Sequence, residues 1–147
     1  MKAKLLNCFL ALLVAVICSS FVSCSKKKSV EDLLTGEWKG VWPIGTFVKD
    51  GHSLNFNKME ETIIFGKNHS LYITRAVYPS DYQTAHPITL NYEGTYSNNN
   101  GTLTLVYEST DGEKTTDMAG CEIKGNQMIL VYVRNHLPFS ITYTKVQ

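Results

Sequence analysis

The stretch Leu33-Leu34-Thr35-Gly36-Glu37-Trp38-Lys39-Gly40-Val41-Trp42 separates two kinds of sequence. From Gly36 onward the two tryptophans and Gly40 fall on one side of an extended chain, and charged or β-branched residues fall on the other. An alternation of period two is typical of a strand with one buried face. Pro43 closes the run because proline has no N–H to donate to a neighbouring strand. The pattern therefore predicts a first strand from Gly36 to Trp42.

A single helical turn is predicted directly before this strand. Ser29 is a favourable N-cap, Glu31 and Asp32 place negative charge in the first turn, and apolar residues follow on one face. Thr35-Gly36 ends the turn, because glycine readily adopts the positive φ of a helix stop.

Residues 1–23 have the layout of a secretory signal peptide. Lys2 and Lys4 form a charged head, and Leu5 to Ile17 form an uncharged run of 13 residues. A helix that spans a bilayer needs roughly 20 apolar residues, so this run is better suited to a cleaved signal than to a membrane anchor.

The signal ends on Phe21-Val22-Ser23-Cys24, which resembles the lipobox of bacterial lipoproteins in the looser form seen in Bacteroidetes. The resemblance implies that Cys24 becomes an acylated N-terminus that anchors the protein in a membrane. The alternative is ordinary cleavage nearby, which leaves Cys24 a free thiol. Ser25, in place of aspartate, resembles the residue of lipoproteins that go to the outer membrane, and the acids that direct surface export in Bacteroidetes lipoproteins are replaced by lysines. The resemblance therefore implies an outer-membrane location in the cell envelope, facing the periplasm.

Residues 24–32 are expected to form a polar tether, since Ser25-Lys26-Lys27-Lys28-Ser29 has no apolar side chain that could join a core. One acyl chain holds a protein only marginally, at about 0.8 kcal/mol per buried methylene. The lysines either reinforce the anchor at anionic headgroups or are simply solvated.

Charge and cysteine content limit the possible functions. The whole chain carries a formal charge of +1, and removal of residues 1–23 takes away two lysines and leaves 12 basic and 13 acidic residues. A charge of −1 is not that of a nucleic-acid-binding domain. Without Cys8 and Cys18, and with Cys24 acylated, Cys121 stands alone, so no intramolecular disulfide is possible. Cys121 is predicted to be buried.

Strand-like segments separated by turn residues fill the rest of the chain. Asn98-Asn99-Asn100-Gly101 is the strongest turn signal, whereas Ile44–Lys58 is either a long connection or a weak hairpin about Asp50-Gly51. Seven strands are predicted after the first: Glu60–Phe65, Ser70–Tyr78, Ile88–Ser97, Thr102–Ser109, Thr115–Lys124, Met128–Arg134 and Phe139–Val146. An all-β meander of eight antiparallel strands most economically removes its edges by closing into an up-and-down barrel. A β-sandwich is the alternative.

The motif Gly36-Glu37-Trp38, after a helical turn and at the start of an eight-stranded meander, resembles the G-x-W signature of lipocalins. The run from Gly94-Thr95-Tyr96 to Met128-Ile129-Leu130 is similar to lipocalin-like domains of Bacteroidetes lipoproteins. The resemblance covers residues 33–147 as one domain. It implies that Trp38 closes one end of the barrel beneath a basic side chain, which Lys145 or Arg134 could supply.

A barrel of this width either fills with its own side chains or holds one small ligand. The expected function is therefore a lipid-anchored binding module for a small apolar or amphipathic molecule. The alternative is a structural or protein-interaction lipoprotein that contacts another envelope protein through the Ile44–Lys58 and Pro79–Pro87 loops. Candidate ligand contacts are aromatic side chains with polar tips: Trp42, Tyr72, Tyr92, Tyr107, Tyr132 and Tyr143.

No catalytic, metal or cofactor site is predicted. Glu60 and Glu61 are neighbours on a strand and face opposite sides, so they cannot act as a carboxylate pair, and no serine has a G-x-S-x-G context. The histidines fall in predicted turns without metal-ligand spacing: His52, His69, His86 and His136. We therefore do not expect an enzyme.

Overall fold

The structure, a computed structural model, describes residues 29–147 apart from 50–51, 81–85, 111 and 135, and for residues 47–49 and 134 it describes the backbone alone. The predicted signal peptide and Cys24 lie outside this part of the chain. No helix within the described residues has the length and apolar content needed to cross a membrane.

The described chain is built almost entirely of strands. Ser29 caps the short helix through a hydrogen bond from the Asp32 amide, as predicted, and Gly36 follows with a φ of 128°. The elements in chain order are α2 (Val30–Leu34), β1 (Gly36–Trp42), β2 (Gly45–Lys49), β3 (His52–Phe65), the 3-10 turn η1 (Lys67–His69), β4 (Ser70–Pro79), β5 (Ile88–Asn99), β6 (Thr102–Ser109), β7 (Lys114–Lys124), β8 (Gln127–Arg134) and β9 (Leu137–Lys145).

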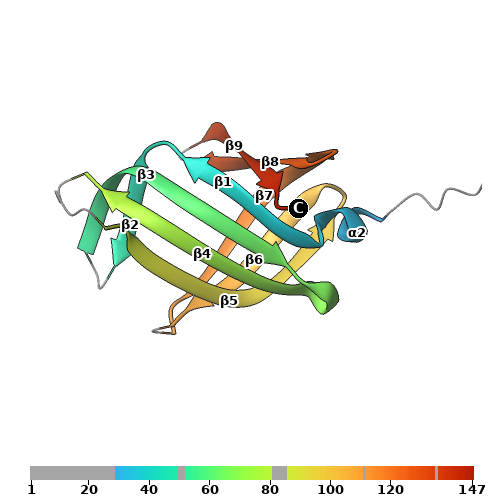
Figure 1. Cartoon of the computed structure of the whole chain (residues 1–147), viewed down its shortest axis with the longest axis horizontal. Helices are drawn as coiled ribbons and strands as arrows, with labels where there is room; N and C mark the ends of the chain where they lie inside the picture. The colour runs from blue at the N-terminus through green and yellow to red at the C-terminus, as the bar shows by residue number, and fades with distance from the viewer. Residues whose placement is uncertain (1–28, 50–51, 81–85, 111, 135) are drawn as a thin grey trace, which may run out of the picture.

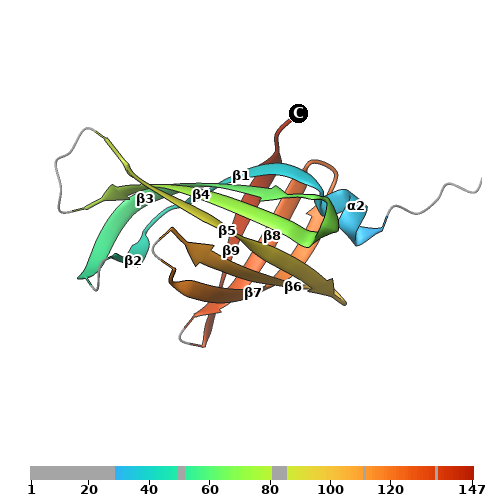
Figure 2. The ribbon, with the colours of Figure 1, turned by 90° about the horizontal axis from the view of Figure 1, so that it is seen from below.

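Eight of these strands close into an antiparallel up-and-down barrel (Figures 1 and 2). Each strand from β3 to β9 pairs with the next along the chain, and β1 closes the ring by pairing with both β9 and β3. This confirms the predicted all-β barrel and excludes the sandwich. The ninth strand, β2, is additional to the ring and pairs with the first half of β3.

The segment Ile44–Lys58 was expected to be either a long connection or a weak hairpin, and it is not a long connection. Trp42 lies opposite Met59 and Gly45 lies opposite Phe56, so β1 and β2 run along β3 in one continuous register. Pro43 interrupts the ladder without ending the pairing, because the strand resumes two residues later. The hairpin expectation is correct, since β2 and β3 pair as far as Lys49 opposite His52, and the predicted turn residues Asp50-Gly51 lie outside the described residues.

Two other features of the hairpins follow from local chemistry. Asn100 and Gly101 form the turn between β5 and β6 with φ values of 51° and 83°, a conformation that these residues adopt at low cost. The last strand begins at Leu137, two residues before the predicted start at Phe139, and so includes Pro138. Pro138 is tolerated there because the β1–β9 ladder begins only at Tyr143, so no β1 carbonyl needs its missing N–H.

Two of the ladders that close the barrel are confined to the α2 end. The ladder between β1 and β9 covers Trp38–Gly40 on β1, and that between β7 and β8 covers Gly120–Lys124 on β7. A Cβ at Gly40 would lie 2.6 Å from Cδ1 of Tyr143, so glycine is needed for that ring to cross the interior. Beyond these ladders the described residues Tyr132–Arg134 of β8 and Leu137–Phe139 of β9 pair with each other but not with β7 or β1.

Apolar side chains fill the α2 end of the barrel, which we call the base. All described ladders and the helix at the base lie between Ser29 and Val146. A protein that begins at Ser25 therefore contains the whole described domain and is suitable for binding experiments. The largest fully buried apolar residues of the base are Leu34, Trp38, Phe65, Leu71, Leu103 and Met128.

A candidate ligand cavity over a filled barrel base

Trp38 closes the base from inside. Its indole N–H donates to the Leu34 carbonyl at 2.6 Å, and the Lys145 ammonium lies 5.0 Å from the ring centroid while donating to the Leu33 carbonyl at 2.9 Å. Glycine is required at position 36 because its φ of 128° is a backbone conformation that other residues rarely adopt, and Cε of Lys145 would lie 2.9 Å from a Cβ there. The structure thus places Lys145 over Trp38, whereas the backbone of Arg134 lies at the far end of β8.

The opposite half of the barrel encloses a half-open cavity of about 890 Å³. One wall, from β1, β3, β4 and β9, is mainly apolar, and the other, from β4 to β7, is mainly polar. The apolar wall includes Trp42, Phe56, Met59, Val77, Phe139 and Ile141. The polar wall includes Arg75, Tyr92, Tyr107, Ser109, Thr115 and Asp117.

A buried carboxylate lies behind two residues that line the cavity, Trp42 and Arg75, and we call its position the floor. Glu61 is 1% exposed and accepts hydrogen bonds from the Tyr143 hydroxyl and, at 3.2 Å, from the Trp42 indole N–H. Its second oxygen receives Nε of Arg75 at 2.5 Å. A buried charge is tolerated only when it is paired and fully hydrogen-bonded, and this arrangement satisfies both conditions.

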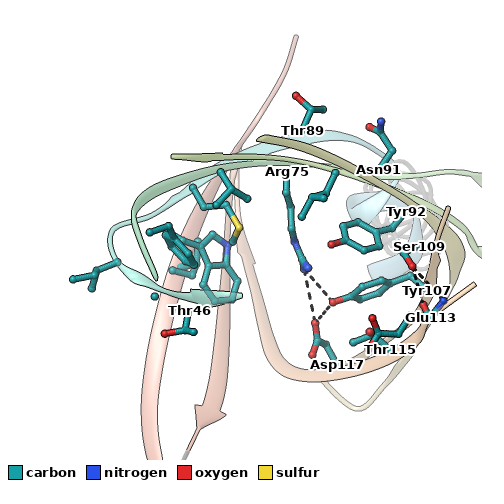
Figure 3. A pocket seen from close by; sticks show the side chains of 18 of the residues that line it. Thr46, Arg75, Thr89, Asn91, Tyr92, Tyr107, Ser109, Glu113, Thr115 and Asp117 are labelled. Carbon is teal, nitrogen blue, oxygen red and sulfur yellow. Dashed lines mark hydrogen bonds and ion pairs between the residues drawn. The ribbon is translucent and has the colours of Figure 1, made fainter. Parts of the chain in front are cut away.

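Arg75 links this floor to the polar wall, and Figure 3 shows the wall side of the link, where Arg75 points toward Tyr107 and Asp117. Its Nη2 donates to the Tyr107 hydroxyl at 3.1 Å and lies 3.9 Å from a carboxylate oxygen of Asp117. The Tyr107 hydroxyl donates in turn to Asp117 at 2.5 Å. The guanidinium also lies 5.0 Å from the ring centroid of Tyr92 and 5.2 Å from that of Tyr107.

The network shifts the pKa values of three of its members. Burial is the largest single influence on Arg75 and would lower its pKa, but the charge attraction and hydrogen bonds of Glu61 and Tyr107 together outweigh burial and hold that pKa well above its usual value. Burial raises the pKa of Tyr143 well above its usual value, and repulsion by the Glu61 carboxylate raises it further. Burial likewise raises the pKa of Tyr107. Both tyrosines therefore remain hydrogen-bond donors at neutral pH.

The structure places the predicted ligand contacts in three different environments. Trp42, Tyr92 and Tyr107 line the cavity. Tyr132 packs on Trp42 with the ring centroids 5.2 Å apart, whereas Tyr143 is completely buried. The expectation that Tyr72 faces the interior is wrong. It is 47% exposed because it alternates on β4 with inward-facing residues.

The charged side chains of the cavity were not among the predicted site residues. The sequence does contain a signal for two of them, because each occupies an inward position of its strand. Glu61 lies between the buried residues Met59 and Ile63, and Arg75 lies between the buried residues Ile73 and Val77. A charge in the apolar phase of a strand indicates a polar group inside the barrel. The prediction that Glu60 and Glu61 face opposite sides is confirmed.

Cys121 and the histidines occupy other positions. Cys121 is half-buried and not buried as predicted, because it packs against the core cluster without lying inside it. Its partial burial raises the pKa of the thiol to about 11. The four histidines are exposed. In the described part of the chain no group of three or more His, Cys, Asp or Glu residues could hold a metal ion.

Fold and cavity together define a class of protein: a closed eight-stranded barrel with a filled base and an amphipathic cavity that opens at the opposite end. Comparison of the chain with known protein families and with curated proteins finds no match.

Proposed function

We propose that the protein is a lipid-anchored binding module of the bacterial cell envelope that holds a small apolar or amphipathic molecule in its barrel. The observation that carries this proposal is the cavity of about 890 Å³ between an apolar and a polar wall. Ligand sites are typically concave, of about 300–1,000 Å³, and apolar with a few placed polar groups. Binding rather than catalysis is proposed for this cavity.

The position of the N-terminus is consistent with an anchored binding module. The chain enters the domain at α2, the end of the barrel opposite the cavity (Figure 1). A tether reaches at most about 3.6 Å per residue, so an acylated Cys24 would hold the base near the membrane. The cavity would then open away from the membrane, toward the periplasm in the outer-membrane location that the lipobox resemblance implies.

A pair of substitutions on one strand tests ligand binding. Thr115 lines the cavity, whereas its neighbour Thr116 points outward from β7. In the chain from Ser25, Thr115→Trp is expected to weaken binding of the neutral dye Nile red at least about tenfold, because the indole occupies the cavity. Thr116→Trp, which adds the same side chain outside, should bind like the unmodified protein. Equal dye affinity in the two variants would contradict binding in the barrel.

The anchor is tested separately in cells. Cys24→Ala should move the protein from the membrane fraction to the soluble fraction, because the acylation site is lost, while Cys121→Ala should leave the distribution unchanged. Fractionation followed by immunoblotting measures both. Retention of the Cys24→Ala protein in the membrane would contradict lipid anchoring.

One observation favours the alternative of a protein-interaction lipoprotein. Met118, Val131 and Val133 are apolar and exposed on the outer face of β7 and β8, by 63%, 40% and 71%. Exposed apolar patches can mark a protein interface. If this alternative holds, the Thr115→Trp and Thr116→Trp variants should bind Nile red with the same affinity. Substitution of Val133 by a charged residue should then weaken Nile red binding.

A further inference from the structure

The guanidinium of Arg75, the cation of the described cavity lining, already has partners along its edges and against its faces. Arg75 has one carboxylate at 2.5 Å, from Glu61, and a second at 3.9 Å, from Asp117. Two tyrosine rings lie against its guanidinium. An anionic ligand that approached Arg75 would have to displace Asp117 or share the guanidinium with two carboxylates.

The charge around the cavity is negative. Arg75, Asp117 and Glu113 line it, and Glu61 lies directly beneath Arg75. Among these described groups one positive charge faces three negative charges, so the formal sum is −2. Low-dielectric walls strengthen this field compared with an exposed surface.

Asp117 is the carboxylate that a ligand can reach. Its side chain is 35% exposed, whereas that of Glu61 is 1% exposed and bonded to three neighbours. Among the described residues, Tyr107 donates one hydrogen bond to Asp117, and an ionised carboxylate offers about four lone-pair sites. Acceptor capacity therefore remains on the cavity side, beside the ring of Tyr107.

From this geometry we infer that the ligand is a cationic amphiphile, with an apolar body against the Trp42 and Phe139 wall and a protonated amine that donates to Asp117. This inference rests on the proposed function, since it assigns a charge to the ligand of the same cavity. Carboxylate and phosphate amphiphiles are disfavoured despite the arginine, because its charge is neutralised inside the protein.

Amphiphiles that differ only in their head group test the inference. Decylamine, decanol and decanoate, each below its micelle concentration at neutral pH, compete with Nile red for the chain from Ser25. Decylamine should displace the dye at a concentration at least about tenfold lower than decanoate, with decanol between them. None of the three should change dye fluorescence in Thr115→Trp.

Two further variants test whether Asp117 causes the preference for decylamine over decanoate. Asp117→Asn keeps the shape of the side chain but removes the charge, and it should reduce the ratio between decylamine and decanoate to about threefold or less. Glu122→Gln removes an acidic charge from the outer face of the same strand and should leave the ratio unchanged. Circular dichroism establishes that both variants are folded.

The outcomes separate the inference from the proposed function. If Nile red binds in the cavity but decanoate competes as well as decylamine, or if Asp117→Asn leaves the ratio unchanged, the cationic ligand is excluded and the binding module stands. If Nile red binding is insensitive to Thr115→Trp, the binding module itself fails.

Discussion

Arg75→Met is expected to destabilise the folded domain by about 3–5 kcal/mol, the cost of removing one partner from a buried ion pair. Methionine fills most of the space that the arginine stem occupies, so the loss is mainly electrostatic. Glu61 would keep the hydrogen bonds from Tyr143 and Trp42 but would lose its counter-charge in a site that is 1% exposed. Urea denaturation followed by circular dichroism gives the free energy of unfolding.

Removal of the second charge should recover much of this loss. In Arg75→Met/Glu61→Gln the floor is neutral, and the glutamine amide can still accept from Tyr143 and Trp42. We expect the double variant to be at least about 1.5 kcal/mol more stable than Arg75→Met alone, since breaking a buried pair costs more than replacing it. A double variant less stable than Arg75→Met would show that the uncompensated charge is not the cause.

An ion pair on the outer face of β3, the strand that carries Glu61, provides the control. Lys58 and Glu60 contact each other at 2.6 Å with both side chains 47% exposed. Lys58→Met removes this pair as Arg75→Met removes the inner one, but water solvates the remaining carboxylate. We expect no measurable change in the denaturation midpoint. A large effect of Lys58→Met would mean that burial does not distinguish the two pairs.

Much of the barrel could be predicted because its signals are local. On β6 the buried residues Leu103, Leu105 and Tyr107 alternate with less buried ones, as the two-residue period of a predicted strand requires, and Asn100-Gly101 marks the turn before it. Such signals depend on the two-residue period of a strand and on which residues tolerate positive φ. They set the number and order of strands, from which closure of the meander follows.

The cavity network could not be predicted in the same way because it depends on register between distant strands. Glu61, Arg75 and Asp117 lie on β3, β4 and β7, and the distances between them follow from how the strands are staggered around the barrel. Alternation identifies each as an inward position, but not which inward charges meet. The same limit left Lys145 and Arg134 as equal candidates over Trp38 until the β1–β9 register placed Lys145 beside it.

Trp38→Ala should cost about 3–5 kcal/mol, as expected when a fully buried aromatic side chain leaves a cavity. The loss also removes the donor to the Leu34 carbonyl and the ring under the Lys145 ammonium. Trp38→Phe should cost less, because it keeps an aromatic ring there and loses chiefly the hydrogen bond, about 1–3 kcal/mol. Urea denaturation of both variants measures these differences.

The two tryptophans of the chain should then separate stability from binding. Trp38 belongs to the base, away from the cavity lining, so Trp38→Phe is expected to leave the Nile red affinity of the folded molecules unchanged. Trp42 lines the cavity and bonds to Glu61, so Trp42→Phe should weaken dye binding at least about threefold through the changed wall. If Trp38→Phe weakened dye binding as strongly as Trp42→Phe, base and cavity would not be independent. The base would then determine the shape of the binding site as well as the stability of the barrel.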